Sequence, residues 1–350
     1  MLQKRKQKID VEIPKLPTYL KRTKIMPMGS NDFGELGFGN DVEEMKYPRH
    51  IENLADFYIV KISCRSLHVV ALTRDGKVIT WECAVFTQGL DDVVIVKVAC
   101  GSNIMLALSD KGQLYASGTF RDNNGNTGFT LAIKKQSMFV KYSPTSYLKI
   151  ADITVGENHV LVLMTNSYLY TFGCMDSYQL RRRISMRKHN GLILIPVKIL
   201  SQIKEIFARE NHSFAIDENG MIFTWGQNVE GQYGIELPNP IITPMKLEFF
   251  KNLIRVNQIF AELHHMLVLL ENGKVYSFSS SKYRQLGIDV SEENRKSPVY
   301  TWGFGETYAL RNQSENNELL PFELKCEEFE EIIEIDRGGQ FLVILSSFCS

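Results

Sequence analysis

Five segments of the chain repeat one pattern of apolar and polar positions. In the segment HVVALTRDGKVITW, residues 68–81, two short apolar runs flank a polar turn that contains glycine. Such runs predict a β-hairpin, because glycine readily adopts the positive φ that the turn requires. The other segments begin at Ile104, His159, His212 and His265, at steps of 36, 55, 53 and 53 residues. No segment keeps a strong 3.6-residue apolar period over three turns, so we expect few helices.

A glycine-rich turn of the form GxLG accompanies the hairpins and brings the number of units to seven. These turns lie at 34–37, before Gly128, at Tyr178, at 231–234, before Gly287 and at Tyr308, with a degenerate copy near Gln88. The step from His265 to Phe341 is 76 residues, which is too long for one unit and too short for two. VYTWG at 299–303 is the second half of a hairpin without a first half. We therefore expect seven units with the sixth truncated, and six units are the alternative.

The two ends of the chain complement each other. KIMPMG at 24–29 is not part of a complete hairpin, and FLVIL at 341–345 resembles the first strand of a hairpin whose second strand is missing. A ring of antiparallel sheets can protect its edge strands by building one sheet from both chain ends. These features predict an all-β fold, a β-propeller closed by strands near 24–29 and 341–348. We expect one propeller domain over residues 24–350, preceded by a disordered basic tail at 1–23.

Composition narrows the class of protein. Forty basic and forty acidic side chains give a net charge of zero, and 44% of the residues are hydrophobic, which indicates a folded chain. The six cysteines include no CxxC pair that could begin a zinc or redox site, so we expect buried, reduced thiols. No apolar run reaches the roughly 18 residues of a membrane span, and the charged N-terminus does not resemble a signal peptide. We expect neither a membrane anchor nor secretion.

Enzyme motifs are absent from the sequence. It contains no GxxxxGK[ST], no HExxH, no GxSxG between a strand and a helix, and no pair of carboxylates on a recognisable scaffold. We therefore expect a protein that is not an enzyme in the covalent sense and that needs neither a metal nor a cofactor.

The hairpin units are similar to the repeats of the regulator of chromosome condensation family. The shared features are a period near 53 residues, a histidine at the strand start, DG or NG hairpins and GQLG turns, which cover about residues 24–348. FRDNNG, within residues 118–128, and SNDFGELGFGNDVEEMKYP at 30–48 resemble the chromatin-bound founding member of the family. The resemblance implies a nucleotide exchange factor for the small GTPase Ran, which would act by binding the nucleotide-free GTPase more tightly than the loaded one.

The resemblance also implies a GTPase-binding surface on one face of the ring. Asp32, Asp122 and Asp176 share a position just before the glycine-rich turn and should face the same side, unless each carboxylate only caps its own turn. Asp122 lies in FRDNNG, and His264 matches a histidine that the family uses in exchange, so both are expected exchange residues. The repeat histidines are expected to be structural, with rings bonded to the backbone near the central shaft: His68, His159, His212 and His265.

A second group of expected GTPase contacts lies in and after the FRDNNG motif. The resemblance implies an extra β-wedge projecting from the third blade, and the aligned stretch here is YSPTSYLK, where Pro144 would break strand pairing. An ordinary connection between blades is the alternative. The expected contacts are Arg121, Asn123, Asn124, Tyr142, Ser143, Pro144, Thr145, Ser146, Tyr147, Leu148 and Lys149.

Two basic clusters are candidate chromatin contacts. Residues 1–24 carry eight basic and two acidic side chains, and KRKQK could bind DNA phosphates or act as a nuclear import signal. The second cluster matches the loop through which the family touches the nucleosome, and a merely solvated loop is the alternative. The candidate residues are Lys4, Arg5, Lys6, Lys8, Arg181, Arg182, Arg183, Arg187 and Lys188.

The sequence therefore predicts a nuclear, chromatin-associated monomer whose partners are a Ran-type GTPase and the nucleosome. In the closing blade, however, Phe341 stands where the family carries another functional histidine. The loss of that polar group, Pro144 and the truncated sixth blade keep a second reading open, a chromatin or ubiquitin-pathway interaction module without exchange activity.

Overall fold

The structure, a computed structural model, describes strands along the chain and the turns between many of them. The described residues are 10–17, 22–31, 34, 36–39, 41–54, 56–66, 68–80, 85–121, 127–174, 176–181, 192, 195–197, 199, 201–228, 240–247, 256–261, 265–270, 275–279, 300–303, 318–323, 332–337 and 341–347. Their regular elements are β-strands and two 3-10 helices, η1 (Glu52–Leu54) and η2 (Ser143–Thr145). Within these ranges no helix is long and apolar enough to cross a membrane.

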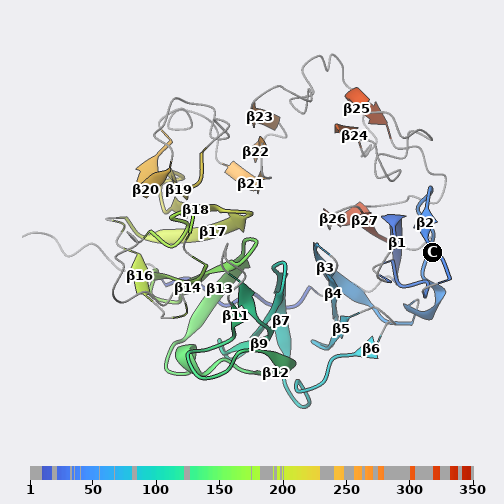
Figure 1. Cartoon of the computed structure of the whole chain (residues 1–350), viewed down its shortest axis with the longest axis horizontal. Helices are drawn as coiled ribbons and strands as arrows, with labels where there is room; N and C mark the ends of the chain where they lie inside the picture. Colours follow the sequence, from blue (N-terminus) through green and yellow to red (C-terminus); the bar gives the residue numbers. More distant parts are fainter. Residues whose placement is uncertain are drawn as a thin grey trace, which may run out of the picture.

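The strands form antiparallel sheets that follow one another around a ring in chain order (Figure 1). The described residues include five four-stranded sheets. In pairing order they are β2 (Glu44–Met45), β1 (Thr23–Ser30), β27 (Phe341–Ser347), β26 (Ile332–Arg337); β3 (Ile59–Arg65), β4 (His68–Thr73), β5 (Val78–Thr80), β6 (Val85–Phe86); β12 (Gln136–Lys141), β9 (Leu114–Gly118), β8 (Ile104–Ser109), β7 (Ile95–Cys100); β13 (Ile150–Val155), β14 (His159–Met164), β15 (Leu169–Gly173), β16 (Ile195–Val197); and β17 (Ile203–Arg209), β18 (His212–Asp217), β19 (Ile222–Gly226), β20 (Ile241–Lys246).

Smaller sheets make up the rest of the described strands. They are the three-stranded β21 (Val256–Ala261), β22 (His265–Leu270), β23 (Val275–Ser279), and the pairs β24 (Tyr300–Gly303), β25 (Glu318–Glu323) and β10 (Phe120–Arg121), β11 (Thr127–Gly128). The five hairpins expected from the repeat are thus present as the second and third strands of five sheets. In the first of them, Gly76 occupies the turn with a φ of 79°, the conformation for which the sequence uses glycine.

The two ends of the chain meet in one sheet. Strand β1 pairs with β27 over seven residue pairs, from Thr23 opposite Ser347 to Gly29 opposite Phe341. The strands expected near 24–29 and 341–348 therefore do pair with each other. Val343, Ile344 and Leu345 are fully buried, so this pairing is part of an apolar core and not a surface contact.

A described inner strand, β14, buries both of its faces against neighbouring sheets of the ring. All six residues of β14 are buried. Val160 and Val162 belong to the apolar cluster shared with β8, whereas Leu161 and Leu163 pack in the cluster that contains Ile206 of β17. Successive side chains of a strand point to opposite faces, so a strand covered on both sides must be apolar at every position. This explains the continuous apolar runs of the hairpins.

An N-terminal segment, residues 10–17, packs against the ring. The backbone N–H of Val11 donates a 2.8 Å hydrogen bond to the carbonyl of Thr165. Val11, Ile13 and Leu16 are partly buried against three different apolar clusters, so the segment spans several sheets. The expected disordered tail therefore does not include residues 10–17, because their alternating apolar side chains find apolar surface to cover. Residues 1–9 lie outside the described residues.

The repeat histidines include a buried ring that joins two sheets. His159 is fully buried, and its Nε2 lies 2.9 Å from the Oγ of Ser213 in the next sheet. The Ser213 hydroxyl donates its hydrogen to the carbonyl of Gln179, so it accepts the bond from His159. A structural role was expected for this histidine, and its ring contacts both a side chain of the neighbouring blade, Ser213, and the backbone of His212. Burial is the main cause that lowers the pKa of His159 to about 3, and charge repulsion from His212 and Arg65 adds to it.

The N-terminal segment should stabilise the ring through its apolar side chains. We expect Ile13→Ser to lower the free energy of unfolding by about 1–2 kcal/mol, because it exposes part of the surface that Ile13 covers. Lys15→Ser, at an exposed position of the same segment, is the matched control and should change stability by less than ~0.5 kcal/mol. Chemical denaturation measures both. Equal stability of the two variants would show that the segment contributes nothing.

The buried neutral histidine should make the fold sensitive to acid. Because the folded-state pKa of His159 lies below the usual 6.5, the unfolded chain binds the additional proton. The stabilisation is complete above pH 6.5 and is lost as the pH falls toward 3, by up to about 1.4 kcal/mol per pH unit. His159→Gln should reduce the change in the free energy of unfolding between pH 6 and pH 4. His68→Gln, which changes the repeat histidine of another hairpin where the side chain is only half-buried, should leave that change as in the wild type. An unchanged slope in His159→Gln contradicts this account.

Candidate functional site

The ring has two rims with different local structure. The turns that precede the second strands bond to one another: Ser66 Oγ donates to Ser102 Oγ at 3.0 Å, and the Ser102 N–H donates to the carbonyl of Glu157 at 2.8 Å. The Glu157 N–H in turn donates to the carbonyl of Glu210. We call this edge the His rim, since the second strands begin there. The opposite edge, called the turn rim, carries the turns between second and third strands, at 74–77, 110–113, 165–168 and 218–221.

Two expected GTPase contacts meet at one residue of the His rim. The backbone N–H of Arg121 lies 3.4 Å from Oδ1 of Asn158, and the N–H of Cys174 donates to the carbonyl of the same asparagine at 2.7 Å. The Cys174 thiol in turn lies 3.4 Å from a carboxylate oxygen of Asp176. Asn158 therefore joins the chain segments that carry Arg121 and Asp176, and sequence reasoning did not single it out. Its place directly before the repeat histidine was the available signal.

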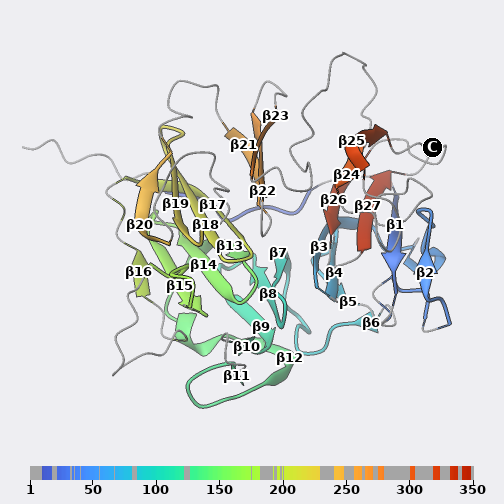
Figure 2. The same ribbon diagram turned by 45° about the horizontal axis from the view of Figure 1, so that its top comes forward.

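An extra two-stranded sheet, which includes Arg121, projects from the His rim. Strands β10 and β11 come between β9 and β12 in the chain but are not part of the four-stranded sheet that contains β9 and β12 (Figure 2). The chain then forms a turn, which we call the 129–135 loop, before β12 begins opposite Gly118. The Phe129 N–H donates to the carbonyl of Ile133 at 2.7 Å and closes the loop. Leu131 is 66% exposed and Ile133 43% exposed, so the loop presents apolar side chains to solvent.

The stretch 142–149, expected to form the wedge, lies at the turn rim instead. Strand β12 runs away from the His rim, from Gln136 opposite Gly118 to Lys141 opposite Tyr115. The stretch then contains the 3-10 helix η2 and leads into β13, with Tyr142 and Thr145 buried. The residues therefore form no β-wedge, because Pro144 favours a helical turn over a paired strand. Tyr147, 74% exposed, is its most accessible aromatic side chain.

Several candidate residues fall outside the described part of the chain. Of the chromatin candidates, Arg181 is described; its N–H donates to the carbonyl of Tyr178 in a turn where both residues have positive φ. The candidates that lie outside the described residues are Asp32, Asp122, Asn123, Asn124, His264, Lys4, Arg5, Lys6, Lys8, Arg182, Arg183, Arg187 and Lys188. The backbone flanking two of them is placed: Arg121 at the His rim precedes Asp122, and His264 directly precedes β22.

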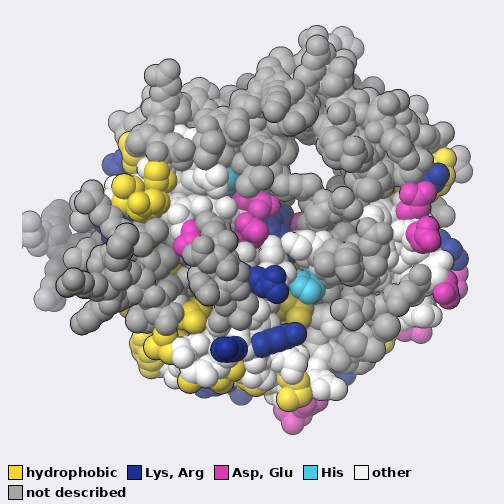
Figure 3. Space-filling view, viewed as in Figure 1, with side chains coloured by type: hydrophobic (Ala, Val, Ile, Leu, Met, Phe, Trp, Pro, Cys, Tyr) yellow, Lys and Arg dark blue, Asp and Glu magenta, His cyan; other side chains and the backbone are white. Residues whose placement is uncertain are grey.

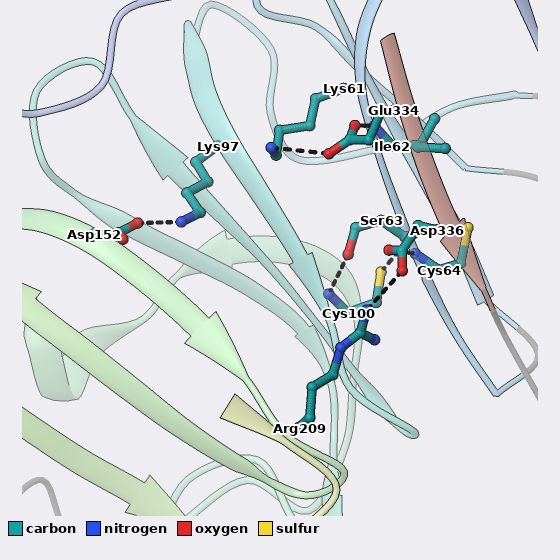
Figure 4. Close-up of polar contacts among 10 residues, drawn as sticks. All are labelled: Lys61, Ile62, Ser63, Cys64, Lys97, Cys100, Asp152, Arg209, Glu334 and Asp336. Atoms are coloured by element: carbon teal, nitrogen blue, oxygen red, sulfur yellow. Dashed lines mark hydrogen bonds and ion pairs between the residues drawn. The ribbon is translucent and has the colours of Figure 1, made fainter. Parts of the chain in front are cut away.

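Ion pairs line the centre of the ring on its innermost strands. Lys61 of β3 pairs with Glu334 of β26 at 3.1 Å, and Lys97 of β7 pairs with Asp152 of β13 (Figure 4). The space-filling view shows acidic and basic side chains gathered near the middle of the ring (Figure 3). Burial raises the pKa of Glu334, whereas Lys61 and the N–H of Ile62 favour its ionised form.

One carboxylate joins three sheets through the centre. Asp336 of β26 accepts a 2.8 Å hydrogen bond from the N–H of Cys64 in β3 and pairs at 2.8 Å with Arg209 of β17 (Figure 4). Burial alone lowers the pKa of Arg209, but Asp336 and its hydrogen bond raise it above the usual value. The pair therefore connects the sheet built from both chain ends to a sheet that is not its neighbour in chain order.

The metal-binding and thiol side chains of the described residues were the remaining candidates for chemistry at this site. They contain no group of three or more histidine, cysteine or acidic side chains that could hold a metal ion. Cys64, Cys100 and Cys174 are buried and form no disulfide bond. Burial raises the pKa of Cys64 well above its usual value and that of Cys100 to about 12, so both stay protonated.

Breaking the central pair should destabilise the fold. We expect Asp336→Asn to lower the free energy of unfolding by about 2–3 kcal/mol, because Arg209 stays mostly buried without its carboxylate. Asp75→Asn is the matched control, since Asp75 and its partner Lys77 are both exposed, and should change stability by less than ~0.5 kcal/mol. Denaturant titration at pH 7 measures both, and an Asp336→Asn protein as stable as the control would refute a stabilising role for the central pair.

Comparison with known proteins agrees with this architecture. The regulator of chromosome condensation of Mus musculus is 24% identical over 382 residues, which cover 92% of this chain and 90% of the mouse protein. The guanine nucleotide exchange factor SRM1 of Saccharomyces cerevisiae is 29% identical over 286 residues, which cover 68% of this chain and 59% of SRM1. The crystal structure of Prp20p of the same yeast, a protein studied for its binding to Gsp1p and histones, superposes with a TM-score of 0.86 at 25% identity. That superposition covers 95% of this chain and 93% of Prp20p.

The match to a protein-family model identifies this chain more specifically than the similarity in fold does. The RCC1-like domain matches residues 24–299, which is most of the chain, and it begins one residue after the start of β1. The matched range includes the five repeated hairpins, the FRDNNG motif and the extra sheet at the His rim. This chain belongs to the RCC1-like domain family.

Proposed function

We propose that this protein is a guanine nucleotide exchange factor for a Ran-type small GTPase, which binds the GTPase at its His rim. Family membership supports the proposal, as does the similarity to a yeast protein named as a nucleotide exchange factor. The observation that carries it is the exposed apolar 129–135 loop, which directly follows the β10–β11 sheet that contains Arg121. An exposed apolar element next to charged side chains is typical of a protein-binding site.

The exchange reaction sets a physical requirement for such a surface. Acceleration of nucleotide release by about 10⁵ needs roughly 7 kcal/mol of preference for the nucleotide-free GTPase. Burial of Leu131 and Ile133 in the emptied GTPase would supply part of it, at about 1.5–3 kcal/mol for each fully buried side chain. Contacts from a rim held rigid by Asn158 and by the bonded turns would supply more. We assign the inserted element to the 129–135 loop in place of the 142–149 stretch.

The remaining polar contacts would come from the same rim. We propose that Asp122 and His264 take part in exchange, and that Asp32, Asn123, Asn124 and Asp176 contact the GTPase. Arg121 and Asp176, joined through Asn158, support the grouping, and His264 adjoins the first residue of β22. Acidic groups on this rim would suit a basic partner surface.

We further propose that residues 24–350 form one closed propeller of seven blades with the sixth truncated. The pairing of β1 with β27 supports closure. The reduced sixth blade rests on the half hairpin at 299–303, of which β24 pairs with β25 among the described residues. The basic tail and the cluster that starts at Arg181 would bind nucleosomal DNA or histones, which would keep the exchange reaction at chromatin in the nucleus. We propose that the protein works as a monomer, without a cofactor.

Labelled-nucleotide release tests this function. Catalytic amounts of the protein should speed release of labelled GDP from a Ran-type GTPase, and Leu131→Asp should slow that release at least tenfold, because a charged group opposes burial of the loop. Asp122→Ala and His264→Ala should also slow it without unfolding the ring. Tyr168→Asp, which changes an exposed aromatic residue of the turn rim, is the matched control and should release GDP at the wild-type rate.

Two results would contradict the proposal. Release at the intrinsic rate with wild-type protein would leave the alternative, an interaction module without exchange activity, and recovery of histones without nucleotide-free GTPase would support that alternative. If Tyr147→Asp slowed release and Leu131→Asp did not, the inserted element would lie at the turn rim. Thermal unfolding of each variant shows whether the ring stays folded.

A further inference from the structure

Tyr142 cannot contact a partner directly, although it starts the stretch that resembles a partner-binding element. Its side chain is fully buried. The ring stacks on Phe172 of β15, with centroids 5.0 Å apart and an interplanar angle of 17°, and meets Phe129 edge-on at 5.3 Å. Its hydroxyl donates a 3.1 Å hydrogen bond to the carbonyl of Phe129. Any part that Tyr142 has in binding must therefore act through the residues that it touches.

The residues that Tyr142 and Phe172 touch lie at both ends of the projecting sheet. Phe120 is the first residue of β10 and packs edge-on against Phe172 at 5.6 Å. Phe129 follows the last residue of β11. The two phenylalanines thus anchor both ends of the extra sheet in the core. Phe120 packs on Phe172 and Phe129 packs on Tyr142, and these two core rings stack on each other. Such edge-on and stacked aromatic contacts favour defined orientations, which an aliphatic cluster would not fix.

The hydrogen bond from the Tyr142 hydroxyl also fixes the orientation of the Phe129 carbonyl. The carbonyl of Phe129 points to the Tyr142 hydroxyl in the core, while the N–H of the same residue bonds the carbonyl of Ile133 and closes the 129–135 loop. The two groups lie on either side of the Phe129 Cα, so the bond to Tyr142 fixes the carbonyl side of a residue whose N–H side closes the loop. Burial raises the pKa of Tyr142 well above its usual value, so the hydroxyl remains a donor at any physiological pH.

We propose that Tyr142 is a positioning residue, which fixes the orientation of the 129–135 loop through the backbone of Phe129 and so presents Leu131 and Ile133 for insertion into the GTPase. The inference rests on the proposed function for its final step, but the orientation of the loop is a property of the free protein. Loss of one hydrogen bond of this kind corresponds to a change of about fivefold in an equilibrium between ordered and displaced loop.

Tyr142→Phe tests the proposal because it keeps the ring and removes only the hydroxyl. Amide hydrogen exchange of the free protein should become about fivefold faster at Phe129 and Ile133 and stay unchanged in β14. With a Ran-type GTPase, the maximal rate of GDP release should fall about fivefold, while the concentration of GTPase at half-maximal rate changes little, since the loop's own contact groups are intact. Tyr142→Leu, which also removes the aromatic contacts, should show larger changes of both kinds.

Tyr170→Phe is the matched control. It removes the hydroxyl of a partly buried tyrosine that packs against the same apolar cluster and should leave loop exchange and GDP release at wild-type values. Equal amide exchange in Tyr142→Phe and Tyr170→Phe overturns the proposal, and so does faster loop exchange with an unchanged release rate. If the wild-type protein itself fails to release GDP, the proposed function fails, and the amide exchange of the free protein still decides whether Tyr142 orients the loop.

Discussion

The structure depends on the burial of both faces of its inner strands, such as β14, by neighbouring sheets. The repeated hairpins are apolar at successive positions, so a sheet that faced solvent on one side would expose valine, isoleucine and leucine side chains to water. In the sheets whose side chains the structure describes, neighbouring sheets of the ring cover them, as the shared apolar clusters show. The pairing of β1 with β27 follows from the same constraint, because the first and last sheets of an open array would each keep an uncovered face and an unpaired edge.

The His rim and the centre of the ring carry different kinds of polar contact. The backbone of the His rim is tied together by bonds between successive turns, which makes it a rigid base for segments that leave the ring. The extra sheet β10–β11 leaves from this rim with Arg121 exposed, and the 129–135 loop that follows it carries the exposed apolar side chains of Leu131 and Ile133. The centre is occupied by ion pairs such as Arg209 with Asp336, which serve the fold by linking distant sheets. The site proposed for a GTPase therefore lies on the rim and not in the middle.

Sequence periodicity predicted the hairpins, the scarcity of helices and the pairing of the chain ends, because each depends on local patterns or on a missing partner strand. It does not determine features that depend on packing. The apolar residues of 10–17 could be assigned to the ring only once the clusters that they cover were known. The inserted element was placed at 142–149 by alignment, but burial of Tyr142 and exposure of Leu131 are set by the direction of β12, which one sequence does not reveal.

The central claim is that the His rim and the 129–135 loop hold a nucleotide-free GTPase. Hydrogen exchange of the complex with a nucleotide-free Ran-type GTPase tests it most directly. Amides of the 129–135 loop and of Arg121 should become protected when the GTPase binds, while the turn rim at 165–168 should exchange as in the free protein. Protection confined to the turn rim, or a complex that leaves the loop as accessible as before, would contradict the account.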